Sequence, residues 1–215
     1  MSLSDIIYLL QERYPGPAIT FNVFHIIKAL LLLGDKVYLS RSKLAKELSI
    51  GDGAVRTLID RMRKAEWIEI DKKGCKLKDK GFKIYKKIKA KIPKMSFIKG
   101  GKLALDKQNF ALLIRKASSK ISLGLEQRDA AVRAGATGAI TLVYKGDKFY
   151  MAGEKEDCEK RYPNGIWIKL REILSPKEDD VIIIAGGRDS KDAEYGALAA
   201  AWSTLSEKKK SKVIR

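Results

Sequence analysis

The hydrophobic positions at the start of the chain recur at helical spacing and are separated by strong helix breakers. Asp5–Arg13 predicts a short amphipathic helix, closed by the breaker cluster Tyr14–Pro17. A longer helix is expected to begin near Thr20. It is apolar nearly all round as far as Leu33, which is typical of a helix buried among others. Gly34 then stands where the residue after a helix end belongs.

A helix-turn-helix is predicted next. Lys36–Leu39 is short and β-prone, and the apolar residues of Leu44–Leu48 predict a second helix. The following segment, Ser49–Gly53, is a tight turn with two glycines, and Asp52 is suited to cap a third helix over about Gly53–Glu66. Two helices joined by so short a turn make a helix-turn-helix.

The third helix has one apolar face and one face that is exposed, basic and able to form hydrogen bonds. Its exposed face carries Arg56, Asp60 and Lys64, flanked by Thr57 and Arg63. In a DNA major groove an arginine donates two hydrogen bonds to guanine, a threonine contacts a base edge and a lysine reaches phosphate. Asp60 either accepts from a cytosine amino group or pairs with Arg56 or Lys64 along the helix, and pairing is the simpler interpretation.

A basic hairpin, or wing, is predicted after the third helix, with Trp67–Ile70 and Cys75–Leu77 as its strands. A hairpin beside a recognition helix is well placed to contact adjacent phosphates or the minor groove. The residues expected to contact DNA across this domain are Ser42, Arg56, Thr57, Asp60, Arg63, Lys64, Lys72, Lys73 and Lys76.

This order of helices and hairpin resembles a winged helix-turn-helix transcription regulator. More narrowly, the chain resembles an archaeal group of predicted regulators in which a winged helix is followed by an uncharacterised C-terminal domain. The resemblance covers about 18–92 and 105–205, implies DNA binding through Arg56, Thr57 and the wing, and supplies no ligand. Cys75 in the wing is a departure, and we interpret it as a small strand residue. The motifs that carry the resemblance are Ser42–Leu48, Gly51–Leu58 and Leu77–Gly81.

Charge is the compositional feature that bears most on function. Lys and Arg total 44 against 26 acidic residues, a net charge of +18, which favours polyanionic partners and nucleic acid first. Residues 1–98 hold a net +11 and residues 99–205 only +3, with eleven lysines in Lys72–Lys94. A thermophile surface would explain the high charge but not its one-sidedness. The lysines of Lys83–Lys91 serve equally well as a solvated helix face.

From residue 108 onward the pattern becomes mixed. Its order, β-α-β-β-α-β-α with a hairpin in the middle, predicts a mainly antiparallel sheet covered on one side by helices. The fold class is therefore α+β: an N-terminal winged helix, mostly α with a small β-wing, followed by a two-layer α+β domain. The expected strands are Phe110–Ile114, Ala139–Tyr144, Phe149–Ala152 and Val181–Ala185, and the expected helices are Leu125–Ala134, Ile166–Leu174 and Lys191–Leu205.

The junction between the two domains is expected at a run of breakers. A helix-stopping proline in Ile92–Lys94 and the pair Gly100–Gly101 mark it. The second domain is expected to sense a ligand, to mediate assembly, or both. The predicted organisation is a DNA-binding domain over 1–95, a linker over 96–102, the α+β domain over 103–205 and a basic, disordered tail over 206–215.

Two clusters in the C-terminal part are candidates for ligand binding. Gly186, Gly187 and Arg188 stand between a buried strand and a helix, so free N–H groups and a guanidinium offer an anion site. The simpler interpretation is a turn with an Asp or Ser cap. Arg128 and Asp129 lie beside a glycine-containing loop, and their simpler interpretation is an ion pair from Asp129 to the arginine four residues on.

Little in the sequence supports an enzyme, a metal site or a cofactor, and we expect none of them. Two cysteines and one histidine are too few for a Cys/His zinc site or a nucleophilic triad, and we expect His25 to be structural. The longest apolar stretches, Ala29–Leu33 and Val181–Ala185, are far shorter than the ~20 residues that span a bilayer. The N-terminus lacks a basic segment, so we expect a cytoplasmic protein without membrane contact.

The leading hypothesis is a sequence-specific DNA-binding transcription regulator. A single winged helix reads few base pairs, so we expect a homodimer on a two-fold site in double-stranded DNA. A small-molecule effector would shift the relative placement of the two DNA-binding domains. Two alternatives stay open: an RNA- or tRNA-associated binding protein that uses the lysine face, and an architectural protein that binds DNA without sequence preference.

Overall fold

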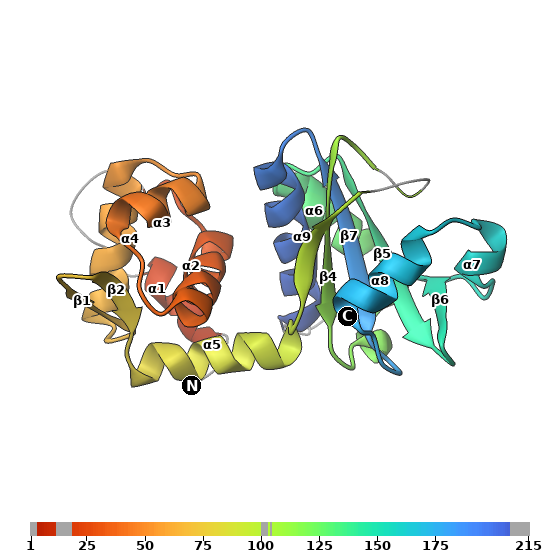
Figure 1. Ribbon diagram of the computed structural model, residues 1–215, viewed down its shortest axis with the longest axis horizontal. Helices are drawn as coiled ribbons and strands as arrows, with labels where there is room; N and C mark the ends of the chain where they lie inside the picture. Colours follow the sequence, from red (N-terminus) through yellow and green to blue (C-terminus); the bar gives the residue numbers. More distant parts are fainter. Residues whose placement is uncertain (1–3, 12–18, 100–102, 104, 207–215) are drawn as a thin grey trace, which may run out of the picture. The chain divides into compact units, whose positions relative to one another are not determined.

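The structure, a computed structural model, describes residues 4–11, 19–99, 103 and 105–206. It divides into two compact units, Met1–Ala90 and Lys91–Arg215, which Figure 1 colours from red to yellow and from green to blue. The predicted breaker Tyr14–Pro17 and the predicted tail beyond Ser206 lie outside the described residues.

Helices make up most of the N-terminal unit, in the order that the sequence predicts. They are α1 (Ser4–Gln11), α2 (Val23–Lys36), α3 (Arg41–Leu48), α4 (Asp52–Lys64) and α5 (Asp79–Lys91). Leu30 of α2, Leu44 of α3 and Leu58 of α4 are almost fully buried, so the core of this unit lies where these helices meet. Among all the described residues, no helix combines the length and the apolar character needed to cross a bilayer.

Helix α2 begins with a reciprocal cap and ends later than the sequence predicts. The Asn22 side chain accepts from the backbone N–H of His25, and the backbone N–H of Asn22 donates to Nδ1 of His25 at 3.1 Å. This capping box confirms a structural role for His25. Gly34 does not end the helix, which runs to Lys36. Instead, Gly34 makes room for a neighbour, since a Cβ there would lie 2.3 Å from the Tyr85 ring.

A two-stranded antiparallel hairpin follows α4. Its strands are β1 (Ile68–Asp71) and β2 (Gly74–Leu77). The predicted strand Lys36–Leu39 contributes a single bridge, from Leu39 to Cys75 of β2. Cys75 is therefore the small, buried strand residue that the sequence predicts, and its backbone hydrogen bonds join the hairpin to the segment before α3.

The C-terminal unit is built on a five-stranded antiparallel sheet (Figure 1). Its strands are β3 (Met95–Ile98), β4 (Gln108–Ile114), β5 (Gly138–Lys145), β6 (Lys148–Met151) and β7 (Val181–Gly187). They lie in the order β3-β4-β7-β5-β6, and the central strand β7 is buried along its whole length. Every pairing is antiparallel, which confirms the predicted α+β class.

Strand β3 changes the predicted domain boundary. The sequence places a linker over 96–102, whereas residues 96–98 belong to an edge strand of the sheet. Phe97 lies opposite Phe110 of β4, and the two rings meet edge to face with their centroids 4.8 Å apart. A short apolar segment between breakers becomes a strand here because β4 offers it a partner. The C-terminal unit accordingly begins at Lys91 rather than at residue 103.

Helices cover both faces of the sheet, which adds a layer to the two that the sequence predicts. They are α6 (Leu125–Arg133), the short α7 (Cys158–Arg161), α8 (Ile166–Leu174) and α9 (Ser190–Leu205), with a 3₁₀ turn η2 (Ser118–Lys120). Trp167 and Leu170 of α8 share a core with Ile184 of β7. Side chains alternate along a strand, so Ala185 points to the opposite face, where Gly196 of α9 lies close to it.

A buried ion pair anchors the start of β7. Asp180 is fully buried, and its carboxylate pairs with the Arg115 guanidinium. The same carboxylate accepts from the backbone N–H groups of Lys116 at 3.0 Å and of Lys177 at 2.8 Å. A buried charge is tolerated when its hydrogen-bonding capacity is met in this way. The C-terminal unit thus uses charged groups internally, as part of its fold.

Candidate nucleic-acid interface

A groove opens on the N-terminal unit where α3, α4 and the hairpin meet. It has a volume of about 420 Å³. Three of the residues expected to contact DNA, Ser42, Arg56 and Asp60, line it together. The other lining residues are Arg41, Asp52, Ile59, Ile70, Gly74 and Cys75. The fold therefore brings the start of one helix, the exposed face of the next and one side of the wing to a single site.

Arg56 brings an available positive charge to the groove. It is exposed, and it forms no hydrogen bond or ion pair with any residue that the structure describes. Asp52 and Asp60 stand one helical turn before and after it on the same helix. An exposed pair at this spacing stabilises a helix by only about 0.3–0.5 kcal/mol, so an external acceptor competes easily for the guanidinium.

The other expected residues of α4 differ in the contacts that their side chains make. The Thr57 hydroxyl donates to the Gly53 carbonyl at 3.0 Å, which turns it toward the helix backbone. Thr57, Asp60 and Lys64 border a second hollow beside the groove. Asp60 and Arg63 form a long ion pair of 3.9 Å, with both side chains about half exposed. A partner other than Arg56 thus accounts for the expected ion pair along the helix.

Helix α4 also begins differently from the sequence prediction. Its N-cap is Gly51, without a side-chain cap, and Asp52 is the first residue of the helix. An acidic residue in the first turn interacts favourably with the helix dipole, so Asp52 stabilises α4 through its charge rather than as a capping side chain.

The expected lysines of the wing differ in their exposure and pairing. Lys72 and Lys73 are exposed at the hairpin turn. Lys76 follows Cys75, which lines the groove, so the strand alternation turns Lys76 to the opposite face. There its Nζ lies 2.7 Å from the Glu69 carboxylate, and this contact raises the pKa of Lys76. The structure therefore does not bring Lys76 into the groove.

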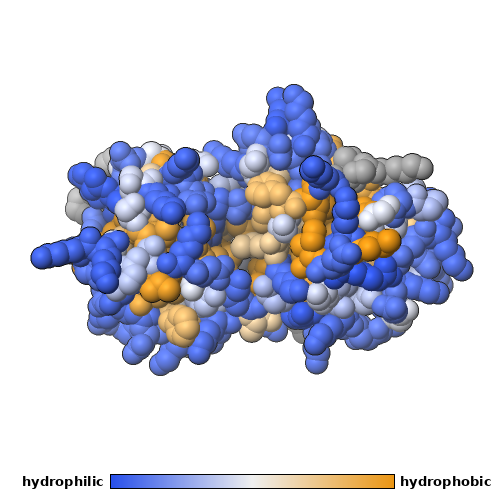
Figure 2. All heavy atoms as spheres, in the orientation of Figure 1, coloured by the Kyte–Doolittle hydropathy of each residue, from blue (hydrophilic) through white to orange (hydrophobic). Residues whose placement is uncertain are grey.

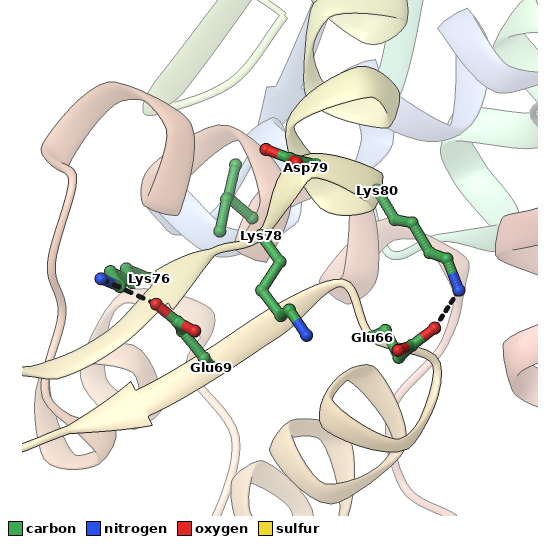
Figure 3. Close-up of a pocket in the computed structure, with 7 residues that line it drawn as sticks. Glu66, Glu69, Lys76, Lys78, Asp79 and Lys80 are labelled. Atoms are coloured by element: carbon green, nitrogen blue, oxygen red, sulfur yellow. Dashed lines mark hydrogen bonds and ion pairs between the residues drawn. The ribbon is translucent and has the colours of Figure 1, made fainter.

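Figure 3 shows the far side of the hairpin, where a cavity of about 440 Å³ lies between the two strands and the start of α5. Glu69 pairs with Lys76 and Glu66 pairs with Lys80, while Lys78 lies between the two pairs. The Lys80 ammonium lowers the pKa of Glu66. Because most charges on this side are matched within the protein, it is a weaker candidate for polyanion binding than the groove.

Three residues that line the groove or support its helix are not singled out by the sequence pattern. Arg41 opens α3 and lines the groove, and its position directly after the cap Ser40 is a signal that could reveal it. Ile70 lines the groove at 48% exposure, and its only signal is an apolar residue on an exposed strand. Arg61 is structural: it is buried and donates to the Leu9 carbonyl at 2.8 Å, joining α4 to α1.

The candidate anion site of the C-terminal unit is occupied by its own chain. Gly186 and Gly187 are buried in β7, where a Cβ on either would lie 2.4 Å from another segment. Asp189 caps α9 by accepting from the backbone N–H of Asp192 at 2.8 Å. This is the turn with an Asp cap that the simpler interpretation describes. Two carboxylates at the helix start disfavour an anion there.

The remaining candidate ligand residues are surface groups. Arg128 and Asp129 pair with each other at 3.0 Å, with both side chains about half exposed, instead of Asp129 pairing with Arg133. Arg188 is exposed. Burial or a supporting hydrogen-bond network normally fixes the side chains of a preorganised ligand site, and these three side chains have neither in the part of the chain that the structure describes.

The two thiols are poorly suited to chemistry. Cys75 and Cys158 are buried, and burial raises the pKa of both, that of Cys158 to about 11. A thiol with a raised pKa stays protonated near neutral pH and is a weak nucleophile and metal ligand. Within the described ranges, no three His, Cys, Asp or Glu side chains come together as a metal site would require.

Comparison with known proteins gives a family likeness for the C-terminal unit and a fold likeness for most of the chain. Residues 105–205 match the model of a family described as a domain of unknown function, DUF4443. A solved structure of a hypothetical protein from Pyrococcus horikoshii OT3 is 22% identical, with a TM-score of 0.68 over 85% of this chain and 91% of that one. An archaeal protein thus shares the fold. The comparison with curated proteins finds no match.

Proposed function

We propose that this protein is a sequence-specific DNA-binding transcription regulator that places α4 in the major groove. The observation that carries the proposal is the groove between α3, α4 and the hairpin, lined by an exposed Arg56 that has no partner among the described residues. A guanidinium held on an exposed helix face is the group that reads guanine through two hydrogen bonds.

The surroundings of the groove support contacts to the DNA backbone. Lys72 and Lys73 stand at the hairpin turn, and Arg41 and Ser42 stand at the start of α3. Basic and hydroxyl groups at such positions, with the N–H groups of a helix N-terminus, bind phosphate and fix the register of the recognition helix. Hydrophilic side chains cover most of this unit on the face that Figure 2 shows.

The C-terminal unit completes the proposal as an assembly or sensing domain. A winged helix alone reads few base pairs, and a homodimer on a two-fold site would read twice as many. An effector that binds one arrangement of the dimer better than another would then change the affinity for DNA. Titration of candidate metabolites that changes neither the stability of the C-terminal unit nor DNA affinity would count against the sensing role.

The test is selection of binding sites from fragmented DNA of the source genome, with recovery of bound fragments at ~0.2 M salt, where contacts to phosphate alone are weakened. We expect enrichment of a common, roughly palindromic site. Arg56→Ala is expected to lose this enrichment. Arg133→Ala, which removes the same charge from an exposed position on α6, is the matched control and is expected to keep it.

Other outcomes separate the alternatives. Uniform recovery of fragments with a steep dependence on salt would contradict the proposal and favour an architectural DNA-binding protein. A preference for duplex RNA over duplex DNA at equal salt would contradict it in favour of an RNA-associated protein.

A further inference from the structure

Resting on the proposed function, we infer that Asp60 is a specificity-determining residue that accepts a hydrogen bond from the amino group of a cytosine, close to the guanine read by Arg56. The geometry that points to this role is a stripe on α4: Asp52, Arg56 and Asp60 recur every four residues, and all three line the groove. The stripe therefore presents a donor between two acceptors to whatever occupies the groove.

The spacing of the stripe fits the spacing of base pairs. Four residues advance an α-helix by about 6 Å, and base pairs are stacked about 3.4 Å apart. Side chains one turn apart on a helix that follows the major groove therefore reach base pairs one or two steps apart. Arg56 and Asp60 accordingly read neighbouring positions of the same site.

Asp60 lacks the structural explanation that Asp52 has. Asp52 lies in the first turn of α4, where the helix dipole favours a negative charge. Asp60 lies two turns further on, and its ion pair with Arg63 is 3.9 Å long and half exposed, so it adds little to stability. A carboxylate in this groove repels phosphate, which makes it costly for non-specific binding. Discrimination between bases would compensate for this weaker non-specific binding.

Cytosine is the base that suits a carboxylate. In the major groove it presents its amino donor, whereas adenine places the N7 acceptor beside its amino group and guanine and thymine present acceptors. Asp60 is thus matched to cytosine and mismatched to the other three bases. An asparagine at the same position would be matched to adenine, because its amide both donates to N7 and accepts from the amino group.

The experiment selects binding sites from a randomised DNA duplex library with the full-length wild-type protein and with Asp60→Asn. We expect the variant to exchange cytosine for adenine at one position while keeping the guanine read by Arg56. Its affinity for the wild-type site is expected to fall about 5- to 150-fold, the range of one good base contact. Glu172→Gln, which makes the same charge change at an exposed position on α8, is the control and is expected to keep the wild-type preference.

The possible outcomes distinguish this inference from the function on which it rests. Unchanged base preferences for Asp60→Asn, with affinity altered equally at all sites, would show that Asp60 acts through charge alone; the inference would then be wrong and the proposed function would stand. A wild-type protein that selects no preferred sequence would overturn the proposed function, and the inference with it. Circular dichroism of each variant checks that the helices are retained.

Discussion

Two sites, one in each unit of this protein, use charged side chains in opposite ways. In the C-terminal unit, Arg115 pairs with the fully buried Asp180, and Arg171 pairs with Glu159 against the core. In the N-terminal unit, Arg56 is exposed and, among the described residues, without a partner. The first arrangement holds a fold together, and the second leaves charge available for another molecule.

This difference shows that the number of basic residues does not by itself locate a binding surface. Residues 99–205 hold 18 basic residues against 21 in residues 1–98, yet acidic residues nearly balance them. The same distinction operates within the wing, where Lys76 is paired with Glu69 and Lys72 is exposed at the turn. Pairing and direction decide which lysines and arginines reach a partner.

The largest expected effect comes from the buried carboxylate. Asp180→Ala leaves the Arg115 guanidinium and two backbone N–H groups without their acceptor. We expect the free energy of unfolding of the C-terminal unit to fall by about 3–5 kcal/mol. Urea unfolding followed by circular dichroism measures this decrease, and hydrogen exchange localises it. Asp129→Ala, at a half-exposed position, is the control and is expected to cost at most about 0.5 kcal/mol.

If Asp180→Ala destabilised the N-terminal unit instead, the result would contradict the assignment of this ion pair to the stability of the C-terminal unit. An unchanged free energy of unfolding for Asp180→Ala would also contradict it, because the buried ion pair would then not stabilise the fold.

The next effect concerns the contact of α2 with α5. Gly34→Ala would bring a Cβ to 2.3 Å from the Tyr85 ring, so we expect the ring to be displaced and the N-terminal unit to be destabilised by about 1–3 kcal/mol. Urea unfolding measures this change. Gly53→Ala is a matched control, because nothing lies within 4 Å of a Cβ there and the first turn of α4 favours alanine. A more stable Gly34→Ala protein would mean that helix propensity outweighs the collision.

A smaller effect is expected on the salt dependence of DNA affinity when the lysines of the wing are replaced. This experiment compares the exposed lysines with the paired Lys76. Replacing Lys72 or Lys73 singly by alanine is expected to reduce the slope of log affinity against log salt. The expected decrease is about 0.9 for each DNA phosphate that the variant no longer neutralises. Lys76→Ala is expected to change the slope less, because Lys76 is paired with Glu69. Fluorescence anisotropy with a selected DNA site measures all three slopes. Equal changes for the three lysines would support Lys76 as a DNA contact and contradict the weaker role expected from its pairing.

The smallest effect is a dependence on pH in the N-terminal unit. The Tyr85 hydroxyl donates to the Asp35 carboxylate at 2.6 Å, which raises the pKa of Tyr85 from 10.0 to about 12. A raised pKa in the folded state means that this contact stabilises fully below pH 10 and loses its effect as the pH rises through 12. The difference in unfolding free energy between wild type and Tyr85→Phe should therefore shrink over that interval. A constant difference would contradict this assignment.

The sequence predicts the fold best where the pattern is local. The apolar spacing of Ile166–Leu174 predicts a helix with the bounds that the structure has. The short strand β3 escapes prediction because four residues between breakers carry too little pattern, and its pairing with β4 is a long-range contact. The helix layer on the second face escapes for the same reason, since the pattern of α8 shows an apolar side but not which face of the sheet it covers.

At the candidate interface, too, the sequence predicts local features better than long-range contacts. The helical period puts Arg56 and Asp60 among the expected contacts, and both line the groove together with Ser42, a third expected contact. Lys76 is an expected contact that stays a prediction: it pairs with Glu69 and does not line the groove, and the sequence pattern alone does not show that pairing. Arg61 looks like one more basic residue of a basic helix, and only the position of α1 shows that it is buried.

The buried thiols have a practical consequence for spectroscopy. Because Cys75 and Cys158 are both buried with raised pKa values, we expect neither to react readily with a maleimide dye at neutral pH. A cysteine introduced on the surface of each unit would then carry the labels without removal of the native ones. Energy transfer between two such dyes would follow, in real time and in single molecules, how the distance between the units responds when a nucleic acid is added.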